Sequence, residues 1–191
     1  MSFLDSEQIK SMGFKSVGEN VLLSSKASYY NCKNISIGNN TRIDDFAVLS
    51  AGEGGIEIGC HVHIAIGVSI MGAGKILIED FAGLSSRVSV YSSNDDYSGM
   101  FMTGPTIPAE FTNVTDGAVT IGRHAIVGSG TVILPNININ EGVAVGALSL
   151  VTKDCEEFGI YMGTPAKKIK ERKRDLLELE KKLNKVKAFV S

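Results

Sequence analysis

The chain has 191 residues, of which 43% are hydrophobic and 21% are charged, and its formal net charge at pH 7 is −2. This composition excludes a disordered chain, and three cysteines without a CxxC spacing argue against a disulfide framework or a cysteine-based zinc site. The first residues show no basic segment followed by an apolar one, and no apolar run is long enough to span a membrane, so we expect a cytoplasmic protein with no integral membrane association.

Residues 1–16 are expected to form an N-terminal capping segment. Asp5 and Ser6 both favour the N-cap position of a helix, and they predict a short helix over residues 5–12. A helix at this place would cover one open end of the repeat array that follows.

Residues 17–164 carry a repeat of six residues. A small or β-branched residue often lies four positions after each aliphatic one, as at Thr41 and Ala125. The in-phase aliphatic residues include Ile37, Ile43, Leu49, Ile58, Ile64, Ile70, Ile78, Leu84, Val90, Ile121, Val127, Ile133, Ile139, Val145 and Val151.

A period of six belongs neither to an α-helix nor to an amphipathic strand. A triangular coil produces it, because three short strands form the sides, aliphatic side chains fill the interior and small residues turn the corners. Stacked coils then pair as parallel strands at the usual spacing of a β-sheet. The repeat therefore predicts an all-β protein, a parallel β-helix of about seven coils.

Residues 94–118 follow neither period and contain two of the four prolines. A loop of this length in a compact domain is usually a binding loop or disordered. Met100, Phe101 and Phe111 make it too apolar for a disordered spacer. We expect a protruding loop that folds over a neighbouring subunit and forms one wall of an active site.

Residues 165–191 are expected to form a C-terminal helix of about 22 residues, because Ile169, Leu176, Leu183 and Val190 recur every seven positions. This apolar stripe would pack on the prism or against its copies around a three-fold axis. The segment holds ten basic and four acidic residues, which would suit nucleic acid or a membrane surface. Since the basic residues alternate with Glu and Leu, we favour a solvated helix face and expect no nucleic acid as a partner.

The repeat unit resembles the motif of the hexapeptide-repeat acyltransferases: an aliphatic residue, then Gly, Ala, Glu or Asp, and three positions later Ser, Thr, Ala or Val. Residues 133–135, 145–154 and 163–167 are similar to the galactoside and maltose acetyltransferase branch. Residues 42–46 and 90–99 look like acyltransferases of surface-polysaccharide biosynthesis, including members that acylate a dTDP-linked 4-amino-4,6-dideoxyglucose. The resemblance implies a left-handed parallel β-helix and a homotrimer.

The resemblance also implies the reaction: transfer of an acetyl group from acetyl-CoA to a hydroxyl or amino group of a sugar, nucleotide-linked, in lipopolysaccharide or O-antigen biosynthesis. No metal is implied. Because the chain has no Gly-x-Ser-x-Gly elbow, we expect direct transfer in a ternary complex rather than a serine acyl-enzyme. Whether the acceptor is a hydroxyl or an amine stays open.

Two residues are candidates for the general base. His124 lies three residues after Ile121, where it should point outward beside the long loop, and imidazole is a natural base at neutral pH. Asp95 lies in the segment where the galactoside branch has its base, and it would act as the base, orient a substrate amine or cap a turn. Which of them is the base stays open. Expected substrate contacts are His63, Arg87, Asn94 and Tyr97.

The resemblance assigns seven residues to CoA: small residues along the pantetheine arm, contacts at the adenine end, and basic residues that face the phosphates. These are, in that order, Ser129, Gly146 and Ala147; Thr152 and Lys153; and Lys167 and Lys170.

Two other functions remain on the same scaffold. A zinc carbonic anhydrase of the γ type uses three histidines, and this chain has three, His61, His63 and His124. In this register, however, Phe81 should lie between His61 and His124, about 10 Å apart, which is too far for zinc ligands at ~2.0–2.1 Å. The other alternative is a binding platform without catalytic activity.

Overall fold

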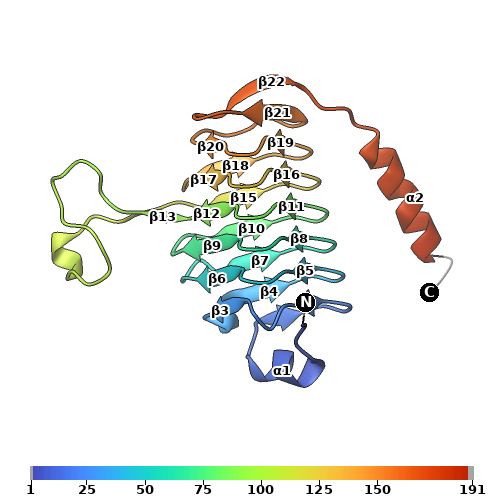
Figure 1. Cartoon of the computed structure of the whole chain (residues 1–191), viewed down its shortest axis with the longest axis horizontal. Coiled ribbons are helices and arrows are strands. Elements are labelled where there is room, and N and C mark those ends of the chain that lie inside the picture. Colours follow the sequence, from blue (N-terminus) through green and yellow to red (C-terminus); the bar gives the residue numbers. More distant parts are fainter. Residues whose placement is uncertain (1, 189–191) are drawn as a thin grey trace.

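A computed structural model describes residues 2–188 of the chain. About seven coils stack into a triangular prism with one β-sheet on each side, and neighbouring strands are parallel except for the last pair of the second sheet. Figure 1 shows the stack rising from the N-terminal to the C-terminal coils. The predicted fold class, a solenoid of parallel strands followed by a C-terminal helix, is confirmed.

Each of the first six coils contributes one short strand to each of the three sheets, and the second sheet has two further strands at its C-terminal end. The first sheet consists of β1 (Ser16–Val17), β4 (Ile35–Ile37), β7 (Ile56–Ile58), β10 (Ile76–Ile78), β15 (Val119–Ile121) and β18 (Ile137–Ile139). The second consists of β2 (Leu22–Leu23), β5 (Arg42–Ile43), β8 (His63–Ile64), β11 (Gly83–Leu84), β16 (Ile126–Val127), β19 (Ala144–Val145), β21 (Gly159–Met162) and β22 (Lys167–Glu171). The third consists of β3 (Ser28–Tyr30), β6 (Val48–Ala51), β9 (Ser69–Gly72), β12 (Ser89–Tyr91), β17 (Val132–Ile133) and β20 (Leu150–Val151).

The in-phase aliphatic residues form the core along the prism axis. Ile58 pairs in register with Ile78, which pairs with Ile121 on the next coil. These side chains are almost completely buried, and the same holds for their equivalents on the other two sheets. Burial of each large aliphatic side chain contributes about 1.5–3 kcal/mol, so the repeat stabilises every coil in the same way.

The corner after the first sheet, which we call the first corner, is built from residues in the left-handed backbone conformation. Asn40, His61, Phe81 and His124 have φ between 57° and 61° and occupy this corner in successive coils. The rings stack on one another, with centroids 4.9 Å apart for His61 and Phe81 and 5.0 Å apart for Phe81 and His124. This column therefore continues the regular stacking of the coils on the outside of the prism.

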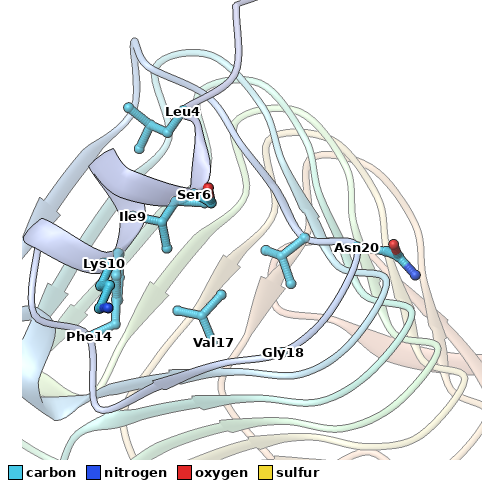
Figure 2. Close-up of a pocket in the computed structure, with 9 residues that line it drawn as sticks. Leu4, Ser6, Ile9, Lys10, Phe14, Val17, Gly18 and Asn20 are labelled. Atoms are coloured by element: carbon cyan, nitrogen blue, oxygen red, sulfur yellow. The ribbon is translucent and has the colours of Figure 1, made fainter.

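The N-terminal end is covered by α1 (Ser6–Ser11), as predicted from Asp5. The Asp5 carboxylate accepts a hydrogen bond from the Gln8 backbone, and the Gln8 side chain accepts one from the Asp5 backbone in return. A cavity of about 490 Å³ lies between α1 and the first coil. Figure 2 shows residues that line it. Ile9 and Val17 are among its apolar lining residues.

The C-terminal prediction needs a correction, because the helix does not begin near residue 165. Lys167–Glu171 form β22, which pairs antiparallel with β21 of the last coil, and the helix α2 spans Leu176–Ala188. The last coil leaves unpaired backbone groups at its edge, and a strand satisfies them where a helix would not. Ile169, counted in the heptad pattern, is therefore a strand residue, and Val190 lies outside the described residues.

Two elements extend from the prism. Residues between β13 (Ser93–Asn94) and β14 (Thr115–Asp116) form a loop that projects away from it, with a short 3₁₀ turn at Ala109–Phe111 (Figure 1). On another side, α2 runs back along the prism and contacts it through Glu180. Within residues 2–188, no helix is both long and apolar enough to cross a membrane.

Candidate active site

The outer face of the second sheet carries a small cavity of about 270 Å³. His63 is the first residue of β8 and lines this cavity. It is in register with Arg42 of β5 on one side and with Gly83 of β11 on the other. A Cβ on Gly83 would meet no atom within 4 Å, so this position leaves the cavity open. The lining residues are His63, Ala65, Gly83, Leu84, Ser85, Ser86 and Ile126.

A buried carboxylate holds the imidazole of His63. The Asp44 side chain is only 8% exposed, and its Oδ2 lies 2.9 Å from Nε2 of His63. Its other oxygen accepts a hydrogen bond from Nε of Arg42 at 2.7 Å. Burial alone would raise the pKa of Asp44, but the hydrogen bonds from Arg42 and His63 outweigh it and hold that pKa below its ordinary value. Asp44 is therefore a fixed negative charge beside the cavity.

Small residues line the corner after the second sheet, which we call the second corner, above this cavity. A Cβ on Gly128 would lie 2.5 Å from the backbone nitrogen of Ala147, so the coils could not stack with a larger residue there. The backbone carbonyl of Ser129 accepts a hydrogen bond from Leu148 at 2.9 Å. Gly146 and Ala147 follow directly after β19 on the same corner. The structure thus places Ser129, Gly146 and Ala147 in one column.

The other predicted CoA contacts are divided between two places. Lys167 and Lys170 lie on β22, which belongs to the second sheet, and both are exposed. Lys168 between them makes the ion pairs of this strand, with Glu156 and Glu171. Thr152 and Lys153, in contrast, follow β20 at the corner after the third sheet, which we call the third corner. Within one chain, Lys167 and Lys170 therefore lie on the same sheet as the cavity. Thr152 and Lys153 lie at a different corner of the prism.

His124 lies on the first corner and not beside the cavity. Its side chain is 10% exposed, is stacked on Phe81, and has its Nε2 2.7 Å from a carboxylate oxygen of Glu180 on α2. Glu180 also accepts a hydrogen bond from the guanidinium group of Arg123 and forms an ion pair with it. The hydrogen bond with His124 holds the pKa of Glu180 below its ordinary value. This geometry does not favour His124 as a base, because α2 covers it and occupies one of its ring nitrogens.

The stacking also bears on the three-histidine alternative. The Phe81 ring lies between the imidazoles of His61 and His124, as the spacing predicted. Residues 2–188 contain no group of three or more His, Cys, Asp or Glu side chains that could hold a metal ion. A single chain therefore cannot bring these two histidines onto one zinc ion.

The two neighbouring aspartates of the loop have different surroundings. Asp96 accepts hydrogen bonds from the backbone and hydroxyl of Ser98, and the hydroxyl bond lowers its pKa. Asp95 is exposed and, among the described residues, has no hydrogen bond or ion pair. Asn94 and the 86% exposed Tyr97 lie on the same loop base. This base is at the third corner, so one chain does not bring it to His63.

Arg87, the remaining predicted substrate contact, lies on the second corner, one coil above Gly67.

Three residues at or beside the cavity, Ser85, Ser86 and Asp44, were not predicted as site residues from the sequence. Asp44 occupies the position after an inward aliphatic residue where other coils of the second sheet carry Ala, Ser or Gly. A carboxylate in a column of small residues is the signal that could have identified it.

The chain is similar to proteins named as acyltransferases, over most or nearly all of its length. A dTDP-4-amino-4,6-dideoxy-D-glucose acyltransferase of Escherichia coli is 58% identical over 180 residues, which are 94% of each chain. A putative lipopolysaccharide biosynthesis O-acetyl transferase of Escherichia coli K12 is 30% identical over 144 residues, 73% of this chain and 69% of the relative. No family model matches the chain.

Solved structures of AntD, an N-acyltransferase from Bacillus cereus, share the fold. The complex with dTDP and 3-hydroxybutyryl-CoA has a TM-score of 0.93 and 47% identity, and the match covers 100% of this chain and 99% of AntD. A serine-to-alanine variant of AntD in complex with dTDP-4-amino-4,6-dideoxyglucose and coenzyme A has a TM-score of 0.93 and 48% identity, over 97% and 98% of the two chains.

The solenoid, its outer cavity and these relatives define the class of the protein: it is an acyltransferase. The chain belongs to the hexapeptide-repeat sugar acyltransferases, the family that includes the Escherichia coli dTDP-4-amino-4,6-dideoxy-D-glucose acyltransferase.

Proposed function

We propose that this protein transfers an acyl group from acyl-CoA to the 4-amino group of a dTDP-linked 4-amino-4,6-dideoxy sugar. The observation that carries the proposal is the 58% identity, along 94% of both chains, to an acyltransferase named for that acceptor. The AntD variant structure, at 48% identity, holds the same nucleotide sugar together with coenzyme A. Carbonic anhydrase activity and a platform without catalytic activity have no comparable support.

The reaction is a direct transfer between two bound substrates. The amine attacks the thioester carbonyl, an amide bond forms, the carbon–sulfur bond breaks and the thiol of CoA leaves. The amine arrives mainly as ammonium, so it releases one proton to the solvent before it attacks, and a second proton leaves the nitrogen as the amide forms. The exposed carboxylate of Asp95 suits an ammonium group, and Lys167 and Lys170 suit the phosphates of CoA. Acetyl-CoA is the expected donor.

The active assembly in this proposal is a homotrimer in which the loop of one subunit completes the site of the next. Two features support it. In one chain the loop base lies at the third corner, whereas the cavity of His63 lies on the outer face of the second sheet. The loop also exposes large apolar side chains, 78% of Met100 and 52% of Phe111, which another copy would cover. A cytoplasmic location fits both substrates, and the product would enter surface-polysaccharide biosynthesis.

The acceptor is tested by a screen that follows the release of free CoA thiol from acetyl-CoA. We expect release with dTDP-4-amino-4,6-dideoxyglucose and none above background with free galactosides. The matched control is a dTDP-linked 6-deoxy sugar with a hydroxyl at C4, which separates an amine from a hydroxyl acceptor. Turnover of the galactosides without turnover of the amino sugar would overturn the proposal.

A further inference from the structure

The environment of His63 differs from that of the other two histidines. His61 and His124 stack on the two faces of Phe81 at the first corner, and α2 covers His124. His63 is 54% exposed, lies on the cavity of the second sheet and is held by the buried carboxylate of Asp44. Of the three imidazoles, it is the one that an acceptor in this cavity would meet.

The contact with Asp44 determines which nitrogen of His63 is available. An ionised carboxylate only accepts hydrogen bonds, so Nε2 of His63 must donate to it. The neutral imidazole then carries its lone pair on Nδ1. Arg42 bonds to the other oxygen of Asp44 and keeps the carboxylate ionised. Buried Asp44 thus fixes both the orientation and the tautomer of the ring.

Apart from His63, the residues that line the cavity carry no charge. Its other lining residues are aliphatic, Gly or Ser, and two charged groups of the neighbouring coil, Asp44 and Arg42, lie beside His63. Ser85 and Ser86 are the lining residues with hydroxyl groups.

We propose that His63 accepts the proton that the acceptor amine loses, and that Asp44 is the positioning residue that holds its imidazole. This inference rests on the proposed function. As the nitrogen–carbon bond forms, the proton moves from the amine to Nδ1 of His63. As the carbon–sulfur bond breaks, the same proton passes from Nδ1 to the departing CoA sulfur. The imidazole ends neutral, and no further reactant is needed.

The first test replaces the imidazole and then returns it. For His63→Ala, we expect kcat with acetyl-CoA and the dTDP-linked amino sugar to fall about 10²- to 10⁴-fold, the usual contribution of a general base. Added free imidazole should restore part of kcat in a saturable manner. The matched control is His61→Asn, on the same coil but at the first corner, where Asn40 already adopts the same backbone conformation. It should retain kcat and show no response to imidazole.

The second test separates positioning from folding. Asp44→Asn can donate a hydrogen bond to Nε2, which moves the ring proton to Nδ1, so we expect kcat to fall at every pH and the acidic limb of its pH profile to change. If Asp44 had only a structural role, Asp44→Asn would lower the yield of folded protein and leave the acidic limb of the pH profile of kcat unchanged. Thermal unfolding and calorimetric binding of CoA establish that each variant is folded.

Two results would overturn the assignment. One is a His63→Ala enzyme whose kcat is unchanged while KM for the nucleotide sugar rises, which would make His63 a binding contact only. The other is a large loss of kcat that imidazole does not restore in a variant that folds and binds CoA. If the wild-type enzyme instead fails with the amino sugar and acylates another acceptor, the proposed function fails, and the same variants test His63 on that acceptor.

Discussion

At the residue scale, contacts between distant parts of the chain decide what each ionisable group can do. His63 and Asp44 are 19 residues apart, about one coil, and His124 and Glu180 are 56 residues apart. His63 therefore lies at the cavity of the second sheet, whereas His124 contacts α2. Asp95 and Asp96 differ in the same way, since Ser98 engages the second and leaves the first exposed.

Docking of α2 should depend on pH through Glu180. Its lowered pKa in the folded state means that its contacts with His124 and Arg123 contribute fully above about pH 4.3, the ordinary value for Glu, and are lost as the pH falls through the lowered value. We expect amide exchange in α2, corrected for its intrinsic pH dependence, to rise over this range. Glu180→Gln should show the faster exchange already at pH 7. Equal exchange at pH 7 in the variant and the wild type would contradict this role.

At the element scale, close stacking of the coils explains where glycine is required. A Cβ on Gly38 would lie 2.5 Å from the carbonyl carbon of Gly59 on the next coil, whereas one on Gly83 would meet open space. Both are glycines on the outside of the prism, so they form a matched pair.

Gly38→Ala should therefore destabilise the protein, by about 1–3 kcal/mol, the usual cost of forcing extra atoms into a packed site. Gly83→Ala should be neutral or stabilising by about 0.4–1 kcal/mol, because alanine restricts the unfolded chain. Urea unfolding of both variants measures the difference. Equal midpoints would show that the coils tolerate a Cβ at this contact and that the stacking argument is wrong.

The strand β22 also carries a functional prediction. Reversal of the charge at Lys167 and Lys170 should raise KM for acetyl-CoA several-fold or more and leave KM for the nucleotide sugar nearly unchanged, since both ammonium groups are exposed on the second sheet. The control is the same double reversal at Lys182 and Lys185 on α2, which changes the net charge equally. If both pairs shift KM alike, only the overall charge matters and the strand lysines do not contact CoA.

At the scale of the whole molecule, the fold was largely predictable and the site was not. Ile58, Ile78 and Ile121 could be placed in the core from their phase alone, because burial in a coil depends on position within six residues. Strand β22 could not be predicted, since it depends on a free strand edge at the last coil, and the heptad phase of Ile169 indicated a helix. Likewise, the repeat alone does not predict the contact between Asp44 and His63, although a carboxylate in a column of small residues distinguishes Asp44.

The central claim is that acyl-CoA and a nucleotide-linked amino sugar meet on the outside of the prism and react without an acylated enzyme. The most direct measurement is a rapid-quench single turnover, with enzyme in excess over acetyl-CoA and saturating dTDP-4-amino-4,6-dideoxyglucose, followed by mass spectrometry of nucleotide and protein. We predict that the N-acetylated nucleotide sugar forms at the rate at which acetyl-CoA disappears, with no acetyl-protein at any time. Acetyl-protein that forms before the product, or acetyl-CoA consumed without an acetylated nucleotide sugar, would contradict the claim.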